Sequence, residues 1–91
     1  MATTLKFTLT GGEYVSDVIV PSENAVTINV TVSDEEPHNL VCEHSINGYF
    51  WQYCGNQHFC DGVELTVDGL RKNVQSVRFK LDAKPKKAEW V

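Results

Sequence analysis

Residues 25–32 read AVTINVTV, with an apolar side chain at every second position. The valines and the isoleucine at the even positions fall on one side of an extended chain, whereas threonine and asparagine fall on the other. Strict alternation of this kind is typical of a strand that buries one face only. The stretch therefore predicts a half-buried β-strand, and the remainder of the chain can be interpreted around it.

Similar short segments lie on both sides of this strand. We expect further strands over residues 4–10, 13–20, 39–45, 49–54, 63–67 and 74–81. Turn signals separate them at Gly11-Gly12, Asn47-Gly48, Cys54-Gly55-Asn56-Gln57 and Asp68-Gly69. Valine, isoleucine and threonine make up 22 of the 91 residues, whereas alanine occurs four times and methionine once, a balance that favours strands over helices. The pattern predicts an all-β fold of seven or eight short strands, either an antiparallel β-sandwich of immunoglobulin-like type or a small barrel.

The length predicts one domain, because 91 residues lie just below the usual domain size. We place the sandwich in residues 1–83 and a basic C-terminal tail or arm in residues 84–91. A domain this small leaves no room for a large cofactor-sized cleft. We therefore expect no cofactor and no small-molecule substrate.

The charge is distributed unevenly along the chain. Residues 1–70 hold one basic and ten acidic residues, for a net charge of −9, whereas residues 71–91 hold seven basic and two acidic residues, for +5. An acidic body repels nucleic acids and anionic membranes, so we expect neither as a partner. No apolar run approaches the length of a membrane span. The first residues also lack the apolar core of a signal peptide, so we expect folding in the cytoplasm with reduced thiols.

Five thiol and imidazole side chains fall close together in the sequence, and such ligands suit zinc. They are Cys42, His44, Cys54, His58 and Cys60. If Asn47-Gly48 and Gly55-Asn56 are two-residue turns, aromatic rings separate these side chains and Cys54 points to the opposite face of the sheet. That geometry disfavours both a zinc site and a disulfide, so we expect no metal site. A different register of the second turn would reopen the zinc interpretation.

No residue pattern predicts catalysis. Cysteine and histidine two positions apart on one strand lie too far apart to form a nucleophilic pair. The carboxylates of Asp34, Glu35 and Glu36 precede a proline and are typical of a solvated loop. The sequence therefore predicts no catalytic residues and no enzymatic activity.

The aromatic residues indicate a protein-binding surface. We expect Trp51 to be the central aromatic residue of the core, which would leave Phe50 and Phe59 exposed on the outer face as a candidate interface. Trp90 lies near the end of the basic segment and would anchor it, either on a neighbouring copy or back on its own sandwich. The predicted partner-binding residues are therefore Lys84, Lys86, Lys87, Trp90, Phe50 and Phe59.

A small, acidic, all-β chain with a charged tail resembles the auxiliary (decoration) proteins on the heads of tailed bacteriophages, across its whole length and without a diagnostic motif. That resemblance implies a non-catalytic structural protein on the virion surface that binds a repetitive partner such as a major capsid protein, or copies of itself. A small soluble inhibitor or adaptor that binds one enzyme is the alternative, and a small zinc-binding domain is a second alternative.

Overall fold

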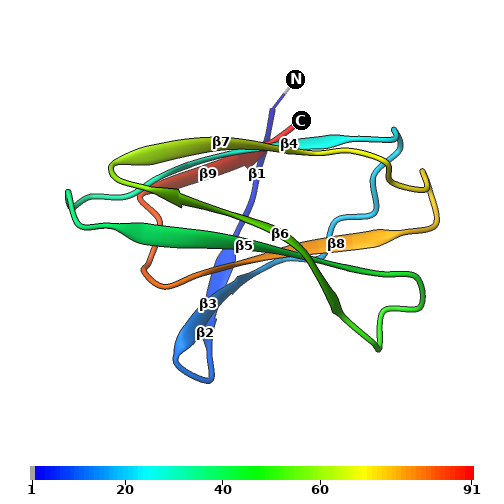
Figure 1. The fold of residues 1–91 in the computed structure, drawn as a ribbon, viewed down its shortest axis with the longest axis horizontal. Helices are drawn as coiled ribbons and strands as arrows, with labels where there is room; N and C mark the ends of the chain where they lie inside the picture. The colour runs from blue at the N-terminus through cyan, green and yellow to red at the C-terminus, as the bar shows by residue number, and fades with distance from the viewer. Residues whose placement is uncertain (1) are drawn as a thin grey trace.

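The computed structural model describes residues 2–91 as nine antiparallel strands, with no helix among these residues (Figure 1). The strands are β1 (Thr3–Thr4), β2 (Phe7–Thr10), β3 (Glu13–Ser16), β4 (Val26–Thr31), β5 (His38–Ser45), β6 (Gln52–Phe59), β7 (Gly62–Val67), β8 (Ser76–Leu81) and β9 (Lys87–Trp90). They form a four-stranded sheet in the order β1-β9-β4-β7 and a five-stranded sheet in the order β2-β3-β8-β5-β6. The predicted all-β antiparallel class is therefore confirmed. Residues 2–91 accordingly hold no helix that is long and apolar enough to cross a membrane.

Apart from β2, the strands pair from the two ends of the chain inward. β1 pairs with β9, β3 with β8, β4 with β7, and β5 with β6. The pairs β4-β9 and β5-β8 then join these ribbons into two sheets. This strand order is that of a jelly roll, in which two sheets are linked by Greek-key connections, and β2 adds one strand beside β3.

The connectivity differs from the immunoglobulin-like type that we expected. In an immunoglobulin domain the last two strands pair within one sheet. Here β8 belongs to the five-stranded sheet and β9 to the four-stranded sheet. Strand number and alternation cannot distinguish these arrangements, because both bury one face of each strand.

The core lies between the two sheets and is built from their inward-facing positions. In β4, Val26, Ile28 and Val30 are at most 1% exposed, whereas Asn29 and Thr31 are exposed. The predicted half-buried strand is therefore confirmed. Burying each aliphatic side chain contributes roughly 1.5–3 kcal/mol relative to leaving it in water. The largest fully buried side chains are Phe79, Ile28, Leu40, Leu81, Val26, Val30, Val77, Pro21 and Cys42.

The turn signals have mixed outcomes. Gly11 and Gly12 connect β2 to β3 with φ angles of 58° and 86°, a conformation that glycine adopts readily. The turn predicted at residues 54–57 is wrong, because those residues lie within β6. The chain turns instead at Cys60 and Asp61, where Asp61 has φ of 65°, and passes to β7 in the other sheet. Aspartate tolerates this left-handed conformation, so the turn requires no glycine at residue 60 or residue 61.

The basic C-terminal segment, expected to be an arm, contributes an inner strand. Residues 87–90 form β9, which lies between β1 and β4, and the backbone N–H of Lys86 donates to the carbonyl of Thr31 at 2.7 Å. Ala88 is 5% exposed, and Trp90 packs against the core. Of the two placements left open for Trp90, the structure shows the one in which the segment folds back on its own sheet.

Candidate functional site

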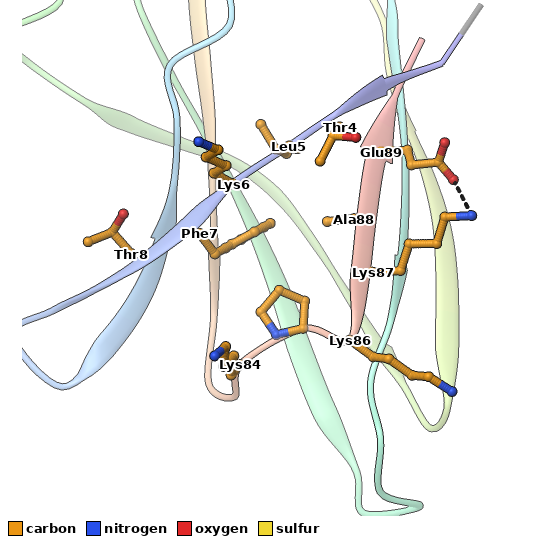
Figure 2. Close-up of a pocket in the computed structure, with 11 residues that line it drawn as sticks. Thr4, Leu5, Lys6, Phe7, Thr8, Lys84, Lys86, Lys87, Ala88 and Glu89 are labelled. Carbon is orange, nitrogen blue, oxygen red and sulfur yellow. Dashed lines mark ion pairs between the residues drawn. The ribbon is translucent and has the colours of Figure 1, made fainter.

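A groove opens where the chain between β1 and β2 leaves the four-stranded sheet. The backbone N–H of Leu5 still donates to the carbonyl of Ala88 at 2.9 Å, but Phe7 begins a strand of the other sheet. The segment that leads into β9 stays with β4, so the two segments diverge. The resulting groove has a volume of about 370 Å³ and is lined by Thr4–Thr8 and Lys84–Glu89 (Figure 2).

Lysines surround this groove, and its floor is apolar. Figure 2 shows the Phe7 side chain directed toward Ala88, whereas the Lys86 and Lys87 side chains extend away from these two residues. Pro85 also lines the groove. The rim lysines are Lys6, Lys84, Lys86 and Lys87. Glu89 is the single acidic residue in the lining, and its carboxylate forms an ion pair with Lys87 Nζ at 3.1 Å. We call this feature the lysine groove; its net positive charge and apolar floor suit an acidic segment of a protein partner that carries apolar side chains.

A second surface lies between β5 and β6. Asn47 organises this loop, because its Oδ1 accepts hydrogen bonds from the backbone N–H groups of Tyr49 at 2.9 Å and Phe50 at 3.0 Å. The Ser45 hydroxyl donates to the same oxygen at 3.1 Å and accepts from the N–H of Gly48 at 2.8 Å. The Asn47-Gly48 signal thus marks a turn as expected, but the loop is longer than two residues, because β6 begins only at Gln52.

Large apolar side chains project from this loop into solvent. Tyr49 is 84% exposed and Phe50 78%, and they are flanked by Ile46 at 55% and Tyr53 at 62%. We call residues 46–51 together with Tyr53 the aromatic loop. A backbone held in place by side-chain hydrogen bonds lowers the entropy that a partner must remove on binding. Aromatic side chains presented in this way are typical of the energetic centre of a protein interface.

Trp51 closes the aromatic loop, and its expected place in the core is wrong. It is only half-buried, and the guanidinium of Arg78 lies 4.2 Å from the centre of its ring. Arg78 Nε also donates to the Glu43 carboxylate at 2.8 Å, and Lys80 Nζ lies 3.5 Å from the same oxygen. Phe79 and Phe59 are the buried aromatic residues instead.

The six predicted partner-binding residues do not lie together. Trp90 is half-buried and packs against the core. Lys84, Lys86 and Lys87 are exposed and lie together in the lysine groove, and Phe50 is exposed in the aromatic loop. The prediction for Phe59 is wrong. Its exposure is 9%, and its ring centre lies 5.8 Å from that of His38. The prediction failed because residues 54–57 continue the strand rather than turning.

The aromatic loop and the segment between β8 and β9, which lines the lysine groove, adjoin opposite ends of β5, and Figure 1 shows the two connections on opposite sides of the molecule. The loop follows the end of β5, whereas residue 81 at the end of β8 pairs with Leu40 near the start of β5. The segment into the groove leaves from that end of β8. One flat partner could therefore contact both surfaces only if it spanned the length of the sheet.

The structure disperses most of the five thiol and imidazole side chains. His44 Nδ1 is hydrogen-bonded to Gln75 Nε2 at 2.7 Å, His58 faces Asn39 on the exposed part of β6, and Cys60 is exposed at the following turn. Among residues 2–91 no three histidine, cysteine or acidic side chains converge as metal ligands would. Two of the five do meet, however. The Sγ atoms of Cys42 and Cys54 lie 2.7 Å apart, so the expectation that Cys54 points away is wrong.

The sequence interpretation did not single out His38, which is 8% exposed at the start of β5. Its Nε2 lies 2.7 Å from Asp34 Oδ1 and its Nδ1 lies 2.9 Å from Asp82 Oδ1. The hydrogen bond to Asp34 raises the pKa of His38 above its ordinary value, Asp82 adds to the shift, and burial opposes it. The same bond to His38 lowers the pKa of Asp34. A histidine held by carboxylates on both nitrogens fastens the loop before β5 to the end of β8. In the sequence, only Pro37, which ends this loop, indicated where the histidine lies.

The exposed features of the molecule are thus the aromatic loop and the lysine groove. Comparison of the chain with models of protein families, with curated proteins and with solved structures finds no match.

Proposed function

We propose that this protein is a non-catalytic binding module that attaches to another protein through the aromatic loop, with the lysine groove as a second, electrostatic contact. The exposure of Tyr49 and Phe50 on a loop that Asn47 holds in place carries the proposal. Exposed aromatic side chains are costly unless a partner covers them, because they leave a large apolar area in water.

The partner that fits best is a repetitive protein shell, as in the decoration of a tailed-phage capsid. Small size and an acidic body support this reading, since mutual repulsion between acidic copies keeps the free protein soluble until a shell binds it. The jelly-roll strand order is also compatible with it, because this architecture occurs in viral capsid and lectin domains. Fold alone does not determine function, so the proposal rests on the surfaces.

The test is affinity capture from the native source with the full chain, at low and at high salt, with the retained proteins identified and counted by mass spectrometry. We expect one abundant, repetitive shell protein, retained less well at high salt because exposed lysines are screened. Replacing Tyr49 and Phe50 by serine should abolish retention. Replacing the exposed Val18 and Val20 by serine is the matched control and should leave it unchanged.

Two outcomes count against this assignment. A single enzyme retained in equal amount would make the protein an inhibitor or adaptor, which is the alternative function. Retention of the shell protein by the Tyr49 and Phe50 variant at the level of the unmodified chain would remove the aromatic loop from the interface.

A further inference from the structure

We propose that Cys42 and Cys54 form a reversible dithiol–disulfide site that closes the base of the aromatic loop. The site does not depend on the proposed function, because it rests on the contact between two thiols. It accounts for two of the three cysteines and leaves Cys60 as a separate exposed thiol.

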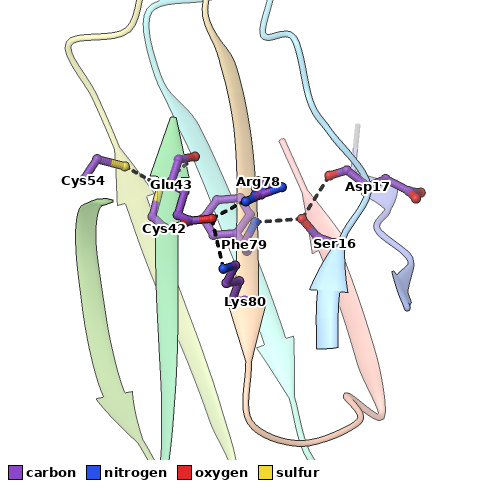
Figure 3. A network of polar contacts seen from close by, with 8 residues as sticks. All are labelled: Ser16, Asp17, Cys42, Glu43, Cys54, Arg78, Phe79 and Lys80. Carbon is purple, nitrogen blue, oxygen red and sulfur yellow. Dashed lines mark hydrogen bonds and ion pairs between the residues drawn. The ribbon is translucent and has the colours of Figure 1, made fainter. Parts of the chain in front are cut away.

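A β-bulge brings the two sulfur atoms together. Cys42 pairs with Gly55 and Glu43 pairs with Tyr53, so Cys54 is the additional residue of β6 with no residue opposite. A bulge redirects the side chain of its additional residue, and Cys54 Sγ reaches to 2.7 Å from Cys42 Sγ (Figure 3). Non-bonded heavy atoms usually pack at roughly 3.5–4.0 Å, and a disulfide bond is about 2.05 Å long. A small approach of the two strands therefore suffices to form the bond.

The two thiols differ in a way that assigns their roles. Cys42 is fully buried in the core, whereas Cys54 is exposed. The hydrogen bond between them lowers the pKa of Cys54, because the Cys42 thiol can donate to the Cys54 thiolate, and it raises the pKa of Cys42, to which burial adds. Cys54 is therefore the thiol that reacts with an external reagent, and Cys42 is the thiol that resolves the intermediate.

The reaction needs an oxidant, and a low-molecular-weight disulfide such as glutathione disulfide supplies it. The Cys54 thiolate attacks one sulfur of that disulfide, which forms a mixed disulfide and releases one glutathione thiolate. Cys42 Sγ then attacks Cys54 Sγ, which forms the internal bond and releases the second glutathione thiolate, and that thiolate takes up the proton of Cys42 as it leaves. The protein loses two hydrogens in total, and one glutathione disulfide becomes two glutathione molecules.

The bond would enclose residues 43–53, which include the exposed Tyr49 and Phe50. A cross-link at the base of a loop restricts its conformations. Oxidation would therefore stiffen the surface that projects these side chains, and reduction would release it.

The test treats the full chain with glutathione disulfide, quenches it with acid, alkylates the free thiols in denaturant and maps them by mass spectrometry. The reduced chain should take up three alkyl groups, one for each cysteine. The oxidised chain should lose two of these sites, retain only Cys60, and yield a linked peptide that contains Cys42 and Cys54. The Cys60→Ser variant is the matched control and should form the same internal bond with no alkylation site left.

The Cys54→Ser variant should form no internal bond. Because residue 54 is exposed, this variant should fold, and a circular dichroism spectrum like that of the unmodified chain checks this. Three alkylated cysteines after equilibration, a stable glutathione adduct on Cys54, or a link that involves Cys60 would each overturn the proposal. Amide hydrogen exchange of residues 46–51 that does not slow on oxidation would overturn the loop-stiffening part.

Discussion

The guanidinium of Arg78 lies over the ring of Trp51, 4.2 Å from its centre. Because Arg78 is in β8 and Trp51 directly precedes β6, this contact spans β5 and fastens the end of the aromatic loop to the sheet. The same guanidinium donates to Glu43 in β5, so one side chain joins three neighbouring segments.

Replacing Arg78 by glutamine should therefore lower the free energy of unfolding by about 1–2 kcal/mol, because it removes a cation–π contact and the closest cation to a mostly buried carboxylate. Urea unfolding followed by tryptophan fluorescence measures the change. The Lys80→Gln variant is the control, since Lys80 Nζ also lies near Glu43, at 3.5 Å, whereas the contact with Trp51 is made by Arg78. This variant should cost about 0.5 kcal/mol or less. Equal losses in the two variants would show that the Trp51 contact adds nothing.

His38 should make the stability depend on pH. Its pKa is raised above 6.5 in the folded chain, chiefly by the hydrogen bond to Asp34, so the folded state binds the proton more tightly than the unfolded state. The contribution of His38 is fully present below about pH 6 and is lost as the pH rises through its folded pKa. The free energy of unfolding of the unmodified chain, minus that of a His38→Gln variant, should therefore decrease as the pH rises from about 6 through the folded pKa of His38. A constant difference would contradict the prediction.

An NMR titration of the imidazole locates the same group directly. We expect the pKa of His38 to lie above 6.5 in the folded protein and to decrease in an Asp34→Asn variant, because the amide carries no negative charge. The exposed His58→Gln variant is the control and should leave the titration of His38 unchanged.

Replacing Asn47 by alanine should loosen the aromatic loop without unfolding the protein. The backbone N–H groups of Tyr49 and Phe50 lose their acceptor, and a hydrogen bond of about 1 kcal/mol corresponds to roughly a fivefold faster amide exchange. Both residues are exposed, so the melting temperature should change little. The Asn29→Ala variant changes an exposed asparagine in β4, in the other sheet, and should leave these two amides unaffected. Unchanged exchange in Asn47→Ala would show that the loop is held by other contacts.

Removing residues 84–91 should abolish cooperative folding and not merely weaken binding. The deletion takes away β9, which pairs with both β1 and β4 and contributes the buried Ala88. The four-stranded sheet would lose its second strand and leave two edges unpaired. Thermal unfolding followed by circular dichroism tests this. The control replaces Lys84, Lys86 and Lys87 by glutamine, which keeps the strand and should change stability by about 0.5 kcal/mol or less. A truncated chain that unfolds cooperatively at the original temperature would contradict the prediction.

The sequence by itself determined the class of the fold and its strongest elements. Alternation over residues 25–32 specifies β4, because a one-residue shift would turn every apolar side chain toward solvent. Phe79 and its neighbours in β8 follow the same rule, and the two glycines at residues 11 and 12 specify the first hairpin, since their φ angles are open to glycine. The exposure of Phe50 was also predicted, although the expected reason, a central core position for Trp51, was wrong.

The tertiary structure alone decided which strands are neighbours and where the thiols lie. Pairing of β1 with β9 joins the two ends of the chain, and no local periodicity encodes a partner that far away. The bulge opposite Cys42 shifts the register of β6 by one residue, which places Cys54 beside Cys42 and, with the displaced turn, Phe59 in the core. The local sequence indicates on which side of a strand a residue lies. Register and sheet order depend on burying the apolar faces of both sheets against each other, which no local segment encodes.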